Sequence, residues 1–69
     1  MSKIKIILNG EEKFFEQGIS IADLIQNLEL DSKKIAIERN LEIADLNSFE
    51  VSVLQDGDRI EIVHFIGGG

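Results

Sequence analysis

The side chains that could carry out catalysis are few in this sequence, and they do not form a catalytic set. His64 is the one histidine, cysteine is absent, and the 13 acidic residues are scattered through the 69 residues. A general base needs a neighbour that orients it, and a metal site needs several ligands at a defined spacing. We therefore predict no catalytic residue and no metal site. We expect His64 at the surface or at the edge of the core, with contact to a partner as the alternative.

Two short motifs look like binding loops but are better explained as a turn and a tail. Asp56-Gly57-Asp58 is far shorter than the loop of a calcium site, and these residue types favour a turn before a strand. Gly67, Gly68 and Gly69 lack the helix that follows the glycines of a phosphate-binding loop. Neither motif predicts a bound cofactor.

The remaining reactive group is the terminal carboxylate of Gly69. Gly67 and Gly68 have no Cβ, so this segment can enter a narrow channel or lie against another backbone. When extended, the four residues from Ile66 reach roughly 13 Å. A carboxylate is ionised at neutral pH and is a poor electrophile, so it needs activation, for example adenylation with ATP, before sulfur can attack. A flexible tail without a function is the alternative.

The first element that must position this tail is a hairpin. Residues 3–8 alternate between lysine and isoleucine and predict a strand with Ile4, Ile6 and Leu8 on one face. Asn9-Gly10 is typical of a two-residue type I′ turn, because both positions tolerate a positive φ. The return strand is predicted over residues 11–16.

One amphipathic helix is predicted over about residues 21–29. Ser20 and Asp23 have the spacing of a capping box, in which each side chain bonds the backbone N–H of the other residue. The apolar residues recur at intervals of three and four and form one stripe: Ile21, Leu24, Ile25 and Leu28.

The second half of the chain predicts further strands. A strand over residues 35–39 and a brief return over 41–43 precede residues 44–54, which have no clear period apart from a short helical turn before Phe49. In the last strand Ile60 and Ile62 alternate with Val63 and Phe65, so we expect the latter two to face outward. Coverage of this pair by a loop or by other strands is the alternative.

This order of elements predicts an α+β fold of the β-grasp, or ubiquitin-like, type. A mixed sheet of four to five strands would carry one main helix across one face, with the first and last strands parallel and central. Residues 1–66 would form the domain, and residues 67–69 a flexible glycine tail.

Composition limits the classes of partner. The net charge of −6 disfavours nucleic acid, where lysine and arginine supply most of the affinity. The apolar run near the N-terminus is too short for a signal peptide or a membrane span, so we expect a cytoplasmic protein that does not bind membranes.

The segment QDGDRIEIVHFIGGG, residues 55–69, resembles the C-terminal signature of the ThiS family, the sulfur carriers of thiamin biosynthesis. LNG near the start, GISIADLI at the helix and IAIERNLEI in the middle are also similar to that family. The family often has a proline after the middle strand pair, where this chain has Ile43-Ala44-Asp45.

The resemblance implies a β-grasp protein that is a co-substrate and not an enzyme. Gly68 and Gly69 match the family's terminal diglycine. By this resemblance, a ThiF-type enzyme adenylates Gly69 with ATP, and sulfur from cysteine, delivered through a desulfurase, converts it to a thiocarboxylate. The thiazole synthase ThiG then receives the sulfur. Val63, Phe65 and Ile66 are the candidate residues for docking to these partners.

Other functions share the fold and the glycine end. They are the small subunit of molybdopterin synthase, a ubiquitin-like protein modifier and, from a different class, a β-grasp module that binds partners non-covalently.

Overall fold

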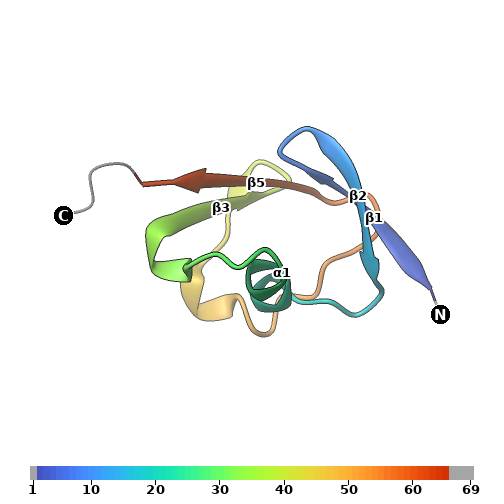
Figure 1. Ribbon diagram of the computed structural model, residues 1–69, viewed down its shortest axis with the longest axis horizontal. Helices are drawn as coiled ribbons and strands as arrows, with labels where there is room; N and C mark the ends of the chain where they lie inside the picture. The colour runs from blue at the N-terminus through green and yellow to red at the C-terminus, as the bar shows by residue number, and fades with distance from the viewer. Residues whose placement is uncertain (1, 66–69) are drawn as a thin grey trace.

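The computed structural model describes residues 2–65, which form a five-stranded mixed sheet with an α-helix across one face (Figure 1). The strands follow the spatial order β2-β1-β5-β3-β4. The elements are β1 (Lys3–Leu8), β2 (Glu11–Glu16), α1 (Ile21–Asn27), the 3-10 turn η1 (Ser32–Lys34), β3 (Ile35–Arg39), β4 (Glu42–Ile43), the 3-10 turn η2 (Leu46–Ser48) and β5 (Arg59–His64). Within this described part, no helix is both long and apolar enough to cross a bilayer.

The first and last strands pair in parallel, and this pairing confirms the β-grasp prediction. Ile7 lies beside Arg59, and Leu8 lies beside Ile60. The other strand pairs, β1 with β2, β3 with β5 and β3 with β4, are antiparallel. β5 is therefore a central strand, held between β1 and β3, and it leads directly toward the C-terminus.

The turn between β1 and β2 has the predicted type I′ character. Asn9 has a φ of 49° and Gly10 a φ of 86°, and Leu8 pairs with Glu11 across the turn. This register places Phe15 beside Ile4 on the helix-facing side and Phe14 beside Lys5 on the outer face of the sheet. Phe15 is half-buried and Phe14 is exposed, so it is the register of the hairpin that decides which of these two side chains faces the helix.

The amino end of α1 carries the predicted capping box. Ser20 Oγ accepts a hydrogen bond of 3.0 Å from the Asp23 N–H, and Asp23 Oδ2 accepts one of 3.1 Å from the Ser20 N–H. Both donors would otherwise lack a partner at the start of the helix. Ser20 is buried, so an N–H group without a hydrogen-bond partner would cost more stability here than at a helix end exposed to water.

The carboxyl end of α1 comes earlier than the periodicity indicates. The helix ends at Asn27, Leu28 is the C-cap, and Glu29 has a φ of 59°. The Leu30 N–H donates to the Ile25 carbonyl at 3.1 Å and the Glu29 N–H to the Gln26 carbonyl at 3.0 Å, which is the Schellman arrangement. Glycine usually occupies the left-handed position of this motif, so the glutamate left no signal of the stop.

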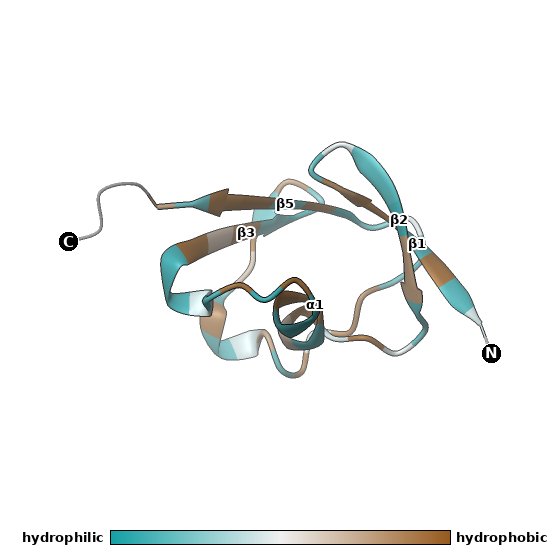
Figure 2. Cartoon of the chain, viewed as in Figure 1, coloured by the Kyte–Doolittle hydropathy of each residue, from teal (hydrophilic) through white to brown (hydrophobic). Residues whose placement is uncertain are grey.

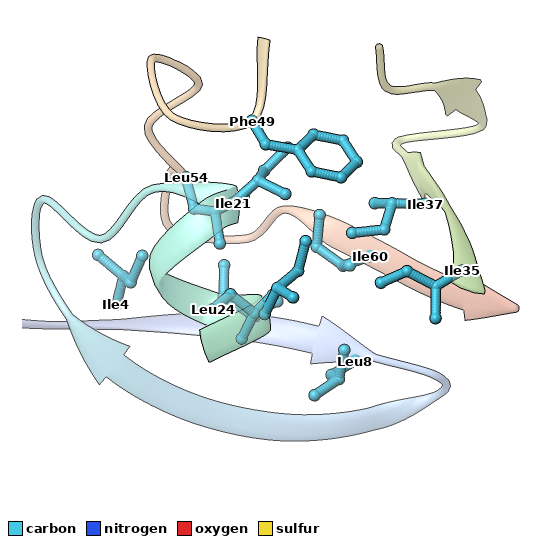
Figure 3. Packing of buried hydrophobic residues seen from close by; sticks show 11 residues of the cluster. Ile4, Leu8, Ile21, Leu24, Ile35, Ile37, Phe49, Leu54 and Ile60 are labelled. Carbon is cyan, nitrogen blue, oxygen red and sulfur yellow. The ribbon is translucent and has the colours of Figure 1, made fainter. Parts of the chain in front are cut away.

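The core lies between α1 and the inner face of the sheet (Figure 3). Ile6, Leu24, Ile37 and Ile60 are fully buried there. The whole cluster consists of Ile4, Ile6, Leu8, Ile21, Leu24, Ile25, Ile35, Ile37, Phe49, Leu54 and Ile60. Alternation on β1 and β5 and the stripe on α1 predicted most of this set, because each pattern matches the period of its element.

The segment without a clear period is fastened to the helix by two buried apolar side chains and by its backbone. Phe49 is 5% exposed and Leu54 is 2% exposed. The Ala22 N–H donates to the Phe49 carbonyl, the Leu54 N–H donates to the Ile19 carbonyl, and Val53 forms an isolated bridge with Ser20. These contacts join distant parts of the chain, which explains why the segment has no local pattern.

Asp58, directly before β5, is a buried carboxylate that accepts several hydrogen bonds. Its Oδ2 accepts hydrogen bonds from Arg39 Nε at 3.0 Å and from the Gln55 N–H at 2.8 Å, and its Oδ1 accepts one from Asn40 Nδ2 at 3.0 Å. Arg39 Nη2 also lies 2.8 Å from Oδ2. Burial raises the pKa of the Asp58 carboxyl, but the hydrogen bonds from Gln55, Asn40 and Arg39 and the Arg39 charge outweigh it and hold the pKa below its ordinary value.

Glu29→Gly should stabilise the protein, because glycine adopts the left-handed conformation without the steric cost of a Cβ. We expect a gain of about 1 kcal/mol, or about 4–8 °C in melting temperature for a domain of this size. Glu29→Ala is the matched control, since it removes the same charge near the helix end and keeps the strain. Equal melting temperatures for the two variants would contradict the assignment to backbone strain.

Asp58→Asn should lower the free energy of unfolding at neutral pH by about 2–4 kcal/mol, because it leaves the Arg39 charge without its partner. A lowered pKa in the folded state means that the ionised Asp58 stabilises the protein fully above the ordinary aspartate pKa of about 3.9. This contribution is lost as the pH falls toward the lower pKa of the folded state. The free energy of unfolding, measured with urea between pH 7 and pH 3, should therefore fall more steeply for the unmodified chain than for the variant. Equal dependence on pH for the two proteins would contradict the prediction.

Candidate functional site at the carboxyl end of β5

The candidate site begins where β5 passes beyond β1. β1 pairs with β5 only as far as Ile60, whereas β3 accompanies β5 through His64. One residue further, the Phe65 N–H donates to the Lys34 carbonyl at 2.9 Å. In Figure 1 the carboxyl half of β5 extends away from the β1–β2 hairpin. The strand is thus anchored on one side up to the last described residue.

Val63 and Phe65 face outward, as the alternation predicted. They are 58% and 60% exposed, while Ile60 of the same strand is fully buried and Ile62 is half-buried. Neither a loop nor another strand of the described residues covers them. Figure 2 shows the hydrophobic colouring continuing along β5 toward its carboxyl end. Exposed apolar side chains that gather at one place mark a surface for contact with another protein.

The outer face beside Val63 combines apolar and acidic side chains. Ala36 of β3 lies opposite Val63, and Glu38 lies opposite Glu61 on the same face. Ile43 of β4 lies opposite Glu38 and is 79% exposed. Two carboxylates directly opposite one another repel, so this face does not contribute optimally to the stability of the sheet. Its composition suits a partner surface that is apolar with a basic side chain.

The predicted docking residue Ile66 and the predicted tail residues Gly67, Gly68 and Gly69 lie outside the described residues. Their assignment to docking and to the modified terminus stays a prediction. Val63 of β5 and Phe65, the residue after the strand, lie within four residues of the predicted glycine tail in the chain.

His64 is exposed, as predicted, and is paired with Ile35 across β3 and β5. Within residues 2–65, no three histidine, cysteine or acidic side chains come together as a metal site. A surface groove of about 460 Å³ lies between α1 and the η2 region and includes Ala22, Ile25, Leu46 and Phe49 in its lining. Its lining contains no residue of β5.

Two residues that position the site were not recognised from the sequence. Asp58 belongs to a predicted turn, yet it joins Arg39 and Asn40 to the start of β5. Asn9 belongs to the predicted hairpin turn, yet its Oδ1 also accepts a hydrogen bond of 2.8 Å from the Ile62 N–H. No local signal could have revealed the second contact, because 53 residues separate its partners.

Comparison with known families and proteins gives a consistent match. The model described as the ThiS family matches residues 3–69. The sulfur carrier protein ThiS of Bacillus subtilis is 41% identical over 63 residues, which cover 90% of this chain and 96% of that protein. A thiazole synthase of Paramagnetospirillum magneticum is 46% identical over 66 residues, which cover 96% of this chain. The chain spans only 20% of the length of that synthase and of a second one from Magnetococcus marinus.

A solved structure shares the fold. The crystal structure of the thiamine biosynthesis protein ThiS from Geobacter metallireducens superposes with a TM-score of 0.83 and covers 96% of this chain and 100% of that one. Its sequence is 23% identical. The arrangement of the sheet and helix is therefore retained where most residues differ.

Proposed function

Because the chain belongs to the ThiS family, we propose that it is a sulfur carrier protein for the thiazole ring of thiamin. The observation that carries this proposal is the family match across residues 3–69, which includes the terminal glycines. The likeness to the Bacillus subtilis sulfur carrier over nearly the whole of both chains supports it. The same observation favours thiamin over the two alternatives with a glycine end, molybdopterin synthesis and protein modification.

In the proposed reaction the chain is a co-substrate, and its partners supply the catalysis. A ThiF-type enzyme transfers AMP from ATP to the Gly69 carboxylate and releases pyrophosphate. The resulting acyl adenylate is an electrophile with a good leaving group, unlike the ionised carboxylate. A sulfide equivalent, derived from cysteine through a desulfurase, then attacks the acyl carbon, AMP departs and a thiocarboxylate remains. Glycine leaves that carbon unobstructed.

The proposed recipient of the sulfur is a thiazole synthase of the ThiG type. Two relatives named thiazole synthase contain a segment like this chain, which supports a working relationship between the two proteins. The described residues would contribute the anchor and the contact surface. β3 and Asp58 hold β5 in place, Val63 and Phe65 would dock together with Ile66, and residues 67–69 would enter the partner. We place this chemistry in the cytoplasm, without nucleic acid or membrane.

The proposal predicts a defined change of mass. After incubation with ATP, a ThiF-type adenylating enzyme, a cysteine desulfurase and cysteine, intact-mass spectrometry should show one oxygen replaced by sulfur at the C-terminus. Deletion of Gly69 should abolish the change, because the register of the tail in the partner is then one residue short. A non-covalent binding module would keep its activity after this deletion. An unchanged mass under all these conditions would contradict the carrier function.

Phe65→Ala should weaken binding to thiazole synthase about tenfold or more, because aromatic side chains at a contact surface carry much of the affinity. Phe14→Ala is the matched control. Phe14 is 62% exposed and lies on the outer face at the far edge of the sheet, away from β5. The free energy of unfolding of both variants should lie within about 1 kcal/mol of that of the unmodified chain, since neither side chain belongs to the core. A Phe65→Ala variant that loses stability but binds thiazole synthase with unchanged affinity would overturn the docking role.

A further inference from the structure

The carboxyl half of β5 has one paired edge and one unpaired edge. Toward β3, the Arg59 carbonyl accepts from the Asn40 N–H at 2.8 Å, and the Phe65 N–H donates to the Lys34 carbonyl at 2.9 Å. Backbone groups alternate in direction along an antiparallel strand. Residues 59, 61, 63 and 65 therefore direct their N–H and C=O groups toward β3, and residues 60, 62 and 64 direct theirs to the opposite side.

On that opposite side, β1 and the turn residue Asn9 that follows it supply partners only as far as the Ile62 N–H. The Ile60 carbonyl accepts from the Asn9 N–H at 2.9 Å, and the Ile62 N–H donates to Asn9 Oδ1 at 2.8 Å. The chain then turns away into β2. Beyond this point the Ile62 carbonyl and both backbone groups of His64 have no hydrogen-bond partner among residues 2–65.

We propose that an extended segment of thiazole synthase pairs with this edge of β5, over Ile62 to His64, and adds a short strand to the sheet. The inference rests on the proposed carrier function and deepens it. A row of unpaired N–H and C=O groups is a template for another strand, and proteins use such edges to bind extended segments. The added strand would lie in the place that β1 leaves after Leu8.

The side chains at this edge support coverage by a partner. Proteins usually protect an exposed strand edge with charged residues. The other long edge, β2, follows this rule with Glu11, Glu12, Lys13 and Glu16. The unpaired stretch of β5 instead carries Ile62, Val63 and His64.

A partner enzyme fits the edge better than a second copy of the chain. Each chain carries a net charge of −6, so two copies repel one another. The edge also ends at His64, three residues before Gly67, where the predicted glycine tail begins. A strand paired at this point would fix the position of β5 in the complex, and so the place from which residues 66–69 continue toward an active site. An apolar side chain of the added strand would lie beside Val63.

Amide hydrogen exchange, measured by NMR on labelled chain, tests the pairing directly. In the free protein the His64 N–H should exchange rapidly, and the Val63 and Phe65 N–H groups, which face β3, should exchange slowly. In a saturated complex with the thiazole synthase of the same organism, exchange at His64 should slow at least tenfold. Unchanged exchange at His64 in that complex would overturn the inference. Protection in the free chain that rises with its concentration would also overturn it, because the edge would then pair with a second copy.

Proline substitution gives a second, independent test. His64→Pro removes the unpaired N–H without removing a bond to β3. We expect binding to thiazole synthase to weaken about tenfold, because one hydrogen bond is lost and its acceptor in the partner is left unpaired. His64→Ala keeps the N–H and should lose less. Glu12→Pro is the matched control at the β2 edge, where the N–H also faces away from the sheet. Equal losses for His64→Pro and His64→Ala would assign the contact to the imidazole and overturn the pairing.

The same samples separate this inference from the carrier function. Each is scored for the C-terminal thiocarboxylate by intact mass after treatment with the ThiF-type enzyme, ATP, desulfurase and cysteine. If the thiocarboxylate forms and is used while the His64 N–H stays unprotected in the complex, the strand pairing is overturned and the proposed carrier function still stands. A chain that neither gains sulfur nor binds thiazole synthase overturns both.

Discussion

The parallel contact between β1 and the chain entering β5 is the constraint on which the rest of the structure depends. The Gly57 N–H donates to the Lys5 carbonyl at 2.7 Å, the Ile7 N–H to the Asp58 carbonyl at 2.9 Å, and the Asn9 N–H to the Ile60 carbonyl at 2.9 Å. A parallel pair needs a long crossover between its strands. Here α1, β3 and β4 lie within that crossover, and the helix covers the inner face of the sheet where Ile6 and Ile60 are buried.

This arrangement separates the residues of β5 that build the core from the residues proposed to contact a partner. Ile60 belongs to the buried cluster and Ile62 packs against it, whereas Val63 and Phe65 are more than half exposed. The domain therefore completes its core before the strand reaches the candidate site. An apolar patch, two opposed carboxylates and an unpaired edge can then remain available at little cost to stability, and all of them lie on or beside the strand that leads to the glycines.

Much of the candidate site could be predicted because alternation along a strand is local. The positions of Ile60, Ile62 and Val63 in β5, and of Phe65 directly after it, determined which side chains would face the core and which would face outward. The role of Asp58 could not be predicted in this way. A short Asp-Gly-Asp segment reads as a turn, and only the fold brings Arg39 and Asn40 to the carboxylate. The early end of α1 was missed because Glu29 occupies a position where glycine is usual.

The sequence by itself determined the hairpin, the capped start of the helix, the strand faces and the family, because turn chemistry, capping and periodicity act between residues a few positions apart. Only the tertiary structure decided where β1 stops accompanying β5 and which backbone groups remain unpaired. The last contact on that side is a hydrogen bond between Asn9 and Ile62, whose partners are 53 residues apart. Contacts over such a separation arise from the packing of whole elements, and no local pattern of residue types encodes them.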